Sequence, residues 1–295
     1  MNYKNGNVLV SISEDGTKVR TWEGIQCLEF PESLDVKITN QCDLECPYCH
    51  ESSVKNGDTG NLDLLFEKLS VLPSGVELAI GGGNPLSHSE LPGFLRKCLS
   101  HGFICNITVN HRHLLEDDYF YLVRDMIRRD LIHGIGISYN RNSSVDNINY
   151  LQKYTDNIVI HTICGVDTVD EVLSLKDKLS YLKLLVLGYK TVGRGAKYMS
   201  PKVDSCIKSW YKNINSIINS CEIISFDNLS IDQLNFRRLM NDSKWNSIYQ
   251  GDDFTLSMYV DAVKGEFAPT SRSNADKRVD WNSMSLTEYF ILNHE

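Results

Sequence analysis

Three cysteines lie within eight consecutive positions, and their spacing could hold a metal. Cys42, Cys46 and Cys49 are arranged C-x3-C-x2-C and follow an apolar run in which Val36 and Ile38 alternate with polar residues. A tight loop that leaves a strand can direct three thiolates toward one point, as ligation of an iron–sulfur cluster requires. Structural zinc sites use four protein ligands, and ordinary clusters use four thiolates. Three cysteines with no evident fourth partner therefore predict a metal position left open for chemistry.

A second motif, Gly-Gly-Gly-Asn-Pro at residues 81–85, directly follows the apolar run at 76–80. Consecutive glycines after a strand allow the backbone to approach a ligand without the clash that a Cβ atom would cause. In isolation such a motif is a tight turn between a strand and a helix. Each of the two motifs comes at the end of a predicted strand, and their combination indicates a ligand site.

The cysteine triplet, with Tyr48 before the third cysteine, resembles the signature loop of radical S-adenosylmethionine enzymes, and residues 81–85 are similar to their second motif. The resemblance implies a [4Fe-4S] cluster on Cys42, Cys46 and Cys49, with S-adenosylmethionine on the fourth iron. One electron then splits this cofactor, and the 5′-deoxyadenosyl radical removes a hydrogen atom from a substrate. The cofactor carries that chemistry, while the protein supplies position and excludes water.

The second motif departs from the family pattern at one position. The family usually has Gly-Gly-Glu-Pro, whereas this chain has Asn84 in place of the acid. An amide carbonyl can accept a hydrogen bond from the methionine ammonium, but the contact is weaker than a charge-assisted one. The resemblance implies that Gly82, Gly83, Asn84 and Pro85 bind the cofactor and that Tyr48 lies near its adenine.

Polar residues end several other predicted strands. In an α/β barrel the carboxyl ends of the strands converge on one mouth, where family enzymes bind the ribose and the methionine carboxylate. Each such residue could equally cap a loop. The cofactor-binding candidates are Asn110, Ser138 and Asn140, and the catalytic candidates are His161 and Cys164.

The glycine-rich segment 188–195 follows another predicted strand and contains two cations, Lys190 and Arg194. Its glycines allow the loop to bend, and its position places both cations at the mouth. We expect Lys190 and Arg194 to reach the methionine carboxylate or an anionic group of the substrate. The alternative is a flexible surface loop.

Strand-like runs alternate with amphipathic stretches from residue 34 to about 226, which is typical of parallel βαβ units. Six or seven such units fit an α/β barrel better than an open doubly wound sheet, and the family resemblance implies a partial (β/α)6 TIM-like barrel. Predicted strands cover 34–40, 76–81, 103–109, 132–138, 157–163, 182–188 and 222–226; predicted helices cover 62–71, 88–101, 115–129, 144–154, 167–179 and 203–219.

Additional elements flank this core on both sides. Alternating residues around the turn at 14–17 predict an N-terminal β-hairpin. After residue 226 the alternation of strands and helices ends, and the sequence predicts one helix at 230–241 followed by a hairpin at 254–267. The predicted units are the N-terminal hairpin at 1–33, the barrel core at 34–226 and a short α+β C-terminal extension at 227–295.

The C-terminal hairpin is similar to the one that opens the SPASM extension of peptide-modifying family members. In those members the hairpin leads to a cysteine of an auxiliary cluster. Here no cysteine follows Cys221, so the sequence predicts a SPASM-like hairpin without an auxiliary cluster. The outcome is then expected to be redox-neutral, or the substrate radical is quenched by another route.

Composition narrows the function classes. The 295 residues are 42% hydrophobic and 23% charged, as in a globular protein, and the net charge of −8 disfavours nucleic acid as a partner. No signal segment and no long apolar span is evident, which predicts neither secretion nor a membrane span. Nine cysteines in a long, core-rich chain indicate a reducing, cytoplasmic setting rather than a disulfide framework.

We therefore predict a radical S-adenosylmethionine enzyme that favours a peptide or protein side chain as substrate. The same chemistry on a nucleoside or another small metabolite is the first alternative. The second is a non-catalytic zinc-binding interaction module in which His50 completes a Cys3His site. Because nothing in the chain reduces a cluster, the hypothesis that the protein is an enzyme implies a flavodoxin or ferredoxin as electron donor.

Overall fold

One mostly parallel sheet organises the molecule. The computed structural model describes residues 2–13, 18–139, 141 and 144–293. In this part of the chain the sheet has ten strands in the order β10-β9-β8-β7-β6-β5-β4-β11-β12-β13. Its strands are β4 (Ser33–Thr39), β5 (Glu77–Gly82), β6 (Ile104–Asn110), β7 (Gly134–Ser138), β8 (Ile158–Ile163), β9 (Lys183–Leu187), β10 (Ile223–Phe226), β11 (Ser257–Asp261), β12 (Glu266–Ala268) and β13 (Val279–Asp280).

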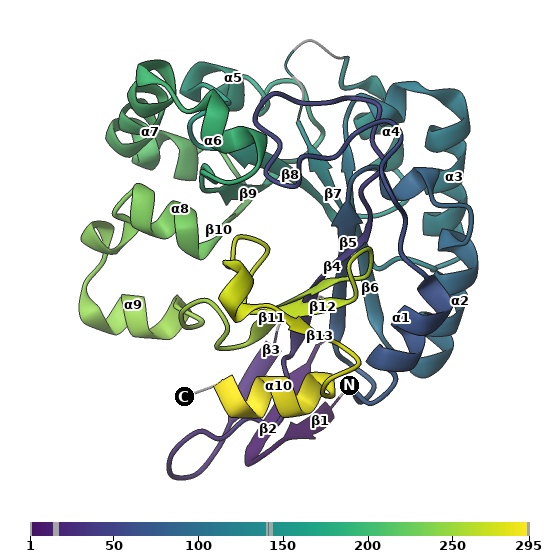
Figure 1. Ribbon diagram of the computed structural model, residues 1–295. Helices are drawn as coiled ribbons and strands as arrows, with labels where there is room; N and C mark the ends of the chain where they lie inside the picture. Colours follow the sequence, from purple (N-terminus) through teal and green to yellow (C-terminus); the bar gives the residue numbers. More distant parts are fainter. Residues whose placement is uncertain (1, 14–17, 140, 142–143, 294–295) are drawn as a thin grey trace.

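Strands β4 to β10 are parallel and adjacent in chain order, which is the result of successive βαβ crossovers. Strand β11 pairs parallel to the free side of β4, and β12 and β13 then add in antiparallel fashion. The sheet is strongly curved, and the crossover helices lie on its outer side (Figure 1). The inner side is therefore left to the loops and to the C-terminal residues.

The crossover helices bury one face each against the sheet, as Leu62, Leu65 and Leu69 do in the first of them. Side-chain caps fix the start of two of these helices: Asn61 accepts the N–H of Leu64, and Thr168 forms a capping box with Glu171. The crossover helices are α1 (Leu62–Leu69), α2 (Leu91–His101), α3 (Asp117–Arg128), α4 (Asp146–Leu151), α5 (Val169–Leu173), α6 (Arg194–Tyr198) and α7 (Pro201–Ile218).

Residues alternate between two environments along the parallel strands. In β4 the side chains of Leu34, Val36 and Ile38 belong to the hydrophobic core, whereas Asp35 and Lys37 occupy the intervening positions of the inner face. Charged residues in a strand that is otherwise apolar are unusual, because both faces of a parallel sheet are normally covered. Their presence indicates that the inner face of this sheet is used for something other than packing.

The seven predicted strands and six predicted crossover helices are confirmed, with ends displaced by a few residues. The predicted helix at 167–179 is too long, because α5 ends at Leu173 and is followed by turns. The predicted helix at 230–241 is wrong as one element. It is divided into α8 (Asn228–Gln233) and a 3-10 helix at Phe236–Leu239 because Asn235 between them has a left-handed φ of 44°.

The flanking segments differ from a pair of simple hairpins. At the N-terminus β1 (Asn2–Asn5), β2 (Val8–Ile12) and β3 (Lys18–Thr21) form a separate three-stranded antiparallel sheet. The predicted hairpin corresponds to β2 and β3, and its turn at 14–17 lies outside the described residues. At the other end the predicted hairpin is β11 and β12, which join the main sheet beside β4, and α9 (Asp242–Ile248) and α10 (Leu286–Asn293) complete the C-terminal part. No helix in the described ranges combines the length and the apolar character needed to cross a bilayer.

Candidate functional site

A cavity of about 670 Å³ lies against the inner face of the sheet. Strands β4 to β11 all contribute to its lining. Small inner-face residues on neighbouring strands, Ala79, Gly81, Gly134 and Gly136, leave the space that larger side chains would fill. Cavities of this size are typical of sites for small ligands.

The structure brings most of the predicted site residues to this cavity. Those that line it are Cys42, Cys46, Tyr48, Cys49, Gly82, Gly83, Asn110, Ser138, His161 and Lys190. The parallel register explains part of the grouping, since Asn110 is the Cα partner of Ser138 and Ser138 is the partner of His161. Asn84, Pro85, Cys164 and Arg194 are not part of the lining, and Asn140 lies outside the described residues.

The cysteine loop is held by backbone hydrogen bonds at its two ends. The N–H of Cys42 donates to the carbonyl of Val54 at 2.8 Å, and the N–H of Cys49 donates to the carbonyl of Cys46 at 3.1 Å. All three cysteines are partly exposed and line the cavity. The loop therefore presents its thiols to the cavity rather than to the hydrophobic core.

The structure places Arg194 against the cysteine loop. Its Nε and Nη1 donate to the carbonyls of Cys46 and Ser53 at 2.9 Å each, and its backbone N–H donates to the carbonyl of Cys49 at 3.0 Å. A Cβ at Gly193 would lie 2.2 Å from the carbonyl oxygen of His50. Segment 188–195 therefore packs backbone to backbone on the cysteine loop, and Arg194 binds that loop instead of reaching into the cavity.

The glycine motif packs against the start of the cysteine loop. The N–H of Gly83 donates to the carbonyl of Thr39 at 2.7 Å, and a Cβ at Gly83 would lie 2.2 Å from the carbonyl oxygen of Gln41. Asn84 is buried, and its side-chain oxygen accepts the N–H of Leu86 at 3.1 Å, which caps the 3-10 helix at Pro85–Ser87. The motif thus shapes the loop, and the Asn84 amide is already used as a cap.

The thiols do not form a closed site for a single ion. Among the described residues, one set of three or more possible ligands has its donor atoms within 4.8 Å of one another, and it consists of Cys42, Asp43 and His113. In a tetrahedral zinc site a Zn–S bond of about 2.3 Å would bring the sulfur atoms to about 3.8 Å from each other. The three cysteine sulfurs do not all lie within 4.8 Å of one another, so in this structure they are not gathered as around one zinc ion.

His50, the fourth ligand of the zinc alternative, is engaged elsewhere. Its Nε2 lies 3.3 Å from Glu51 Oε1 and 3.4 Å from Lys190 Nζ. Burial lowers the pKa of His50, and Lys190 lowers it further, although Glu51 opposes both. The histidine is therefore part of a polar network behind the cysteine loop.

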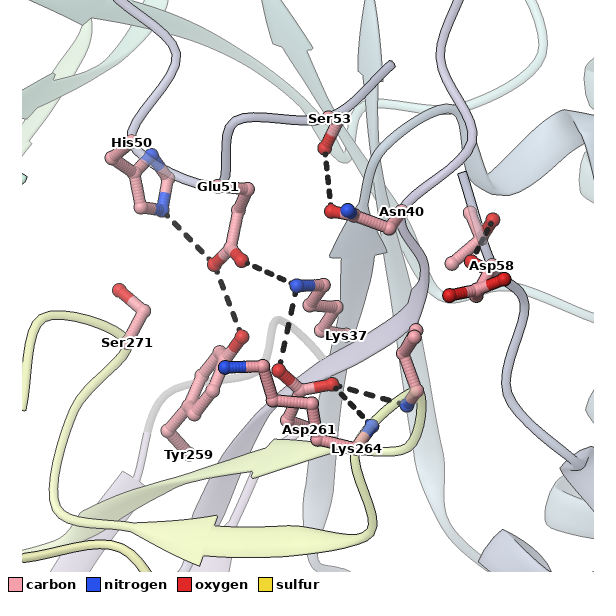
Figure 2. Close-up of polar contacts among 12 residues, drawn as sticks. Lys37, Asn40, His50, Glu51, Ser53, Asp58, Tyr259, Asp261, Lys264 and Ser271 are labelled. Atoms are coloured by element: carbon pink, nitrogen blue, oxygen red, sulfur yellow. Dashed lines mark hydrogen bonds and ion pairs between the residues drawn. The ribbon is translucent and has the colours of Figure 1, made fainter. Parts of the chain in front are cut away.

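Figure 2 shows this network, which the sequence did not predict. Lys37 Nζ lies 2.8 Å from Glu51 Oε2 and 3.4 Å from Asp261 Oδ2, and the Tyr259 hydroxyl donates to Glu51 Oε1 at 3.0 Å. The Lys37, Glu51 and Asp261 side chains are 6%, 11% and 2% exposed. The network joins the cysteine strand, the cysteine loop and the C-terminal hairpin.

The charges in the network stabilise each other. Burial would lower the pKa of Lys37, but the Glu51 and Asp261 carboxylates outweigh it and raise this pKa. Burial would likewise raise the pKa of Glu51, but His50 and Lys37 hold it far below its ordinary value. Both groups are therefore charged at neutral pH. A lysine in the middle of an apolar strand was the one sequence signal that could have revealed this network.

The two catalytic candidates have different surroundings. The His161 ring faces the cavity beside Gly136, where a Cβ would lie 2.3 Å from its Cε1 atom. Burial lowers the pKa of His161 to about 4, so the ring is neutral at pH 7. Cys164 is buried outside the cavity, its thiol lies 3.5 Å from Gln233 Oε1, and burial raises its pKa to about 12.

Comparison with solved structures identifies the fold. The chain matches Streptococcus suis SuiB bound to S-adenosylmethionine with a TM-score of 0.65 and 14% identity over 90% of this chain and 66% of SuiB. It matches SuiB bound to the precursor peptide SuiA with a TM-score of 0.63, 13% identity and coverage of 90% and 65%. The fold is that of SuiB.

The resemblance to radical S-adenosylmethionine enzymes drawn from the two motifs is thus confirmed at the level of the fold. The chain spans slightly less than two thirds of the length of the SuiB chains, at 65–66%. No protein-family model matches the chain. No sequence among the curated proteins matches it either.

Proposed function

We propose that this chain is a radical S-adenosylmethionine enzyme that acts on a peptide or protein side chain. One observation carries the proposal: the three cysteines line a cavity on the inner face of a parallel sheet whose fold is that of SuiB, which was solved with S-adenosylmethionine bound. SuiB was also solved with a precursor peptide, and this favours a peptide over a nucleoside as the substrate class.

Cys42, Cys46 and Cys49 would hold a [4Fe-4S] cluster. The chemistry that such a cluster supplies when it binds S-adenosylmethionine is one-electron cleavage of the cofactor to a 5′-deoxyadenosyl radical, which removes a hydrogen atom from the substrate. Arg194 and the glycine motif keep the loop in place through the carbonyls that they bind or contact. A flavodoxin or ferredoxin is the proposed electron donor, and a reducing cytoplasm is the proposed compartment.

The chain supplies binding groups along the mouth of the cavity. Tyr48, whose ring centroid lies 5.8 Å from that of Tyr198, is proposed to contact the adenine. Asn110 and Ser138, which are neighbours in the sheet, are proposed to bind the ribose or the methionine carboxylate, together with Asn140. Gly82 and Gly83, which line the cavity, are proposed cofactor contacts, and Asn84, Pro85 and Arg194, which lie outside its lining, are proposed to support the site from behind.

Two side chains at the cavity are suited to position the substrate. The neutral His161 ring can donate or accept a hydrogen bond without introducing a charge. Lys190 Nζ donates to Ser271 Oγ at 2.9 Å and so connects segment 188–195 to the C-terminal extension. Cys164 would first have to exchange its buried contact with Gln233 for a place in the cavity, and this makes it the weaker catalytic candidate.

We further propose that the curved sheet is a partial (β/α)6 barrel, with units at 1–33, 34–226 and 227–295. Six helix-connected parallel strands, β4 to β9, supply the barrel, and β10 continues it. The C-terminal unit contributes Tyr259 and Ser271 to the cavity lining. In this arrangement the extension closes one side of the cavity without an auxiliary cluster.

The proposal is tested by anaerobic reconstitution with iron and sulfide, followed by incubation with S-adenosylmethionine and dithionite. We expect visible cluster absorbance and formation of 5′-deoxyadenosine, both abolished by Cys42→Ala, Cys46→Ala or Cys49→Ala. Cys27→Ala removes an exposed cysteine far from the loop in sequence and serves as the matched control. A chain that holds zinc and no cluster, or that forms 5′-deoxyadenosine equally in all four variants, would overturn the proposal.

A further inference from the structure

A second cavity, of about 360 Å³, adjoins the first. Asp35, Lys190 and Ser271 line both cavities, so the two spaces meet at these residues. The second cavity lies between the amino-terminal part of β4, the segment after β10 and residues 269–272 of the C-terminal extension. An extended ligand that occupies both cavities would pass Asp35.

Asp35 is the carboxylate without a partner in this region. Its side chain is accessible from the two cavities that it lines, and within the part of the chain that the structure describes no group forms a hydrogen bond or an ion pair with it. The other carboxylates that line the two cavities all have partners: Glu32 binds Arg20, Glu51 binds Lys37, Glu77 binds Lys18, Asp167 accepts the N–H of Ile163, Asp227 accepts the N–H groups of Gly188 and Ser230, Asp252 accepts the Tyr249 hydroxyl and Asp253 binds Arg272.

The surroundings of Asp35 favour a cation. Burial raises the pKa of its carboxyl, the Lys190 ammonium lowers it, and the smaller effects of Asp227, Asp253 and Glu51 raise it again, so that the pKa is raised on balance. The Lys190 ammonium is itself directed to Ser271. An unpaired carboxylate on a cavity wall, with three other carboxylates nearby, can gain from pairing with the cationic group of a ligand.

We propose that Asp35 binds the cationic side chain of a lysine or arginine in the peptide substrate, an inference that rests on the proposed function. Along β4, Asp35 lies four residues before Thr39, or about 13 Å below the end of the strand that carries the cysteine loop. S-adenosylmethionine is expected against that loop. A long basic side chain suits this depth, because its apolar stem can cross the cavity while its charged end reaches the carboxylate.

The test uses the purified chain and pools of short synthetic peptides that share a random Ala, Gly, Ser and Leu background around one fixed central residue. The fixed residue is Lys, Arg, Gln or Glu, and the fraction of each pool retained by the immobilised protein is measured by mass spectrometry. We expect retention of the Lys and Arg pools about tenfold above the Gln pool, the effect of one charge-assisted hydrogen bond. This comparison needs no variant.

Two variants assign the preference to Asp35. Asp35→Asn should bring the Lys to Gln ratio close to one, and Asp35→Lys should favour the Glu pool. Asp232→Asn, which removes an exposed carboxylate outside both cavities, should keep the ratio of the unmodified protein. The inference is overturned if basic pools are not preferred, or if Asp35→Asn retains the preference.

A separate binding measurement tests whether Asp35 contacts the peptide or the cofactor. Binding of S-adenosylmethionine to the reconstituted protein should be equal for the unmodified chain and Asp35→Asn. A loss of cofactor affinity that matches the loss of peptide preference would place the methionine ammonium at Asp35 and overturn the inference. Peptide retention needs no cluster, so a chain that prefers basic pools yet forms no 5′-deoxyadenosine would contradict the proposed function alone.

Discussion

Lys37 and Asp35 lie two residues apart on β4 and on the same face of the sheet, yet their surroundings are opposite. Lys37 is buried and contacts two carboxylates, and Asp35 is exposed to both cavities without a partner among the described residues. A buried charge in an otherwise apolar strand requires a partner within the fold, whereas one that faces a cavity is accessible to water and to a ligand. On β4, Lys37 is neutralised within the fold, and the proposal assigns the unpaired Asp35 to binding.

The neutralised charge connects segments far apart in the sequence. Glu51 follows the last cysteine of the loop, and Asp261 and Tyr259 belong to β11, which pairs with β4 in the sheet. The C-terminal hairpin contributes a carboxylate and a hydroxyl to the network through its first strand. The network therefore provides a direct contact between the C-terminal extension and the cysteine loop.

The largest effect is expected from Lys37→Met, which preserves the length of the side chain and removes its charge. Glu51 and Asp261 would then be buried near each other without their shared cation. Breaking one partner of a buried ion pair costs about 3–5 kcal/mol in the free energy of unfolding, and Tyr259 and His50 still contact Glu51, which favours the lower value. Equilibrium urea unfolding measures this change.

Lys244→Met provides the control for that measurement, because Lys244 is exposed on α9 and surface substitutions change stability by about 0.5 kcal/mol or less. The double variant Lys37→Met, Glu51→Gln should recover part of the loss, since it removes one of the two carboxylates. A loss of under about 1 kcal/mol in Lys37→Met, the usual value of an exposed pair, would show that the network is solvated and that the comparison with Asp35 fails.

A smaller effect is expected from Tyr259→Phe, which removes the hydroxyl that donates to Glu51 and keeps the ring. A hydrogen bond to a charged group contributes about 1.5–3 kcal/mol to the free energy of unfolding. Because Glu51 still contacts Lys37, we expect a loss at the lower end of this range, about 1.5 kcal/mol. Amide hydrogen exchange at residues 50–54 should increase with it, because the loop loses its contact with β11. Tyr121→Phe, on an exposed ring of α3, should change neither quantity; equal exchange in both variants would contradict the connection.

The sequence could predict those parts of the site that depend on residue spacing and on the succession of strands along the chain. The cysteine loop and the polar ends of β6, β7 and β8 do meet at one cavity, because parallel strands place their carboxyl ends along one edge. The contact between Lys37 and Asp261 was not predictable in this way. These residues are brought together by the pairing of β11 with β4, and no local pattern indicates that a late strand inserts beside an early one.

Sequence patterns also could not predict which polar side chains form hydrogen bonds with the main chain. Asn84 is expected to contact the cofactor because it replaces the acid of the family motif, and Arg194 is expected to reach the cofactor or an anionic substrate group because it lies in a glycine-rich loop at a strand end. In the structure the carbonyls of Cys46 and Ser53 and the N–H of Leu86 satisfy them. A polar residue in such a loop signals a hydrogen bond, and its type does not reveal whether the partner is a ligand or the main chain.

The smallest effect, and the sharpest test of the comparison, is expected from Asp35→Asn. The raised pKa of Asp35 means that the folded state favours the protonated carboxyl, so the ionised group opposes folding at neutral pH and ceases to do so as the pH falls. The variant should therefore be at least as stable as the unmodified chain near neutral pH, and this advantage should disappear in acid. Urea unfolding across this pH range measures both.

Glu51→Gln should show the reverse dependence on pH. Its pKa lies far below the ordinary value of 4.5, so ionised Glu51 stabilises the fold above that value, and the stabilisation is lost as the pH falls below it. The variant should be less stable than the unmodified chain at neutral pH and approach it in acid. If Asp35→Asn instead loses stability at neutral pH, Asp35 is paired within the fold as Lys37 is, and no carboxylate on β4 is left for a basic side chain.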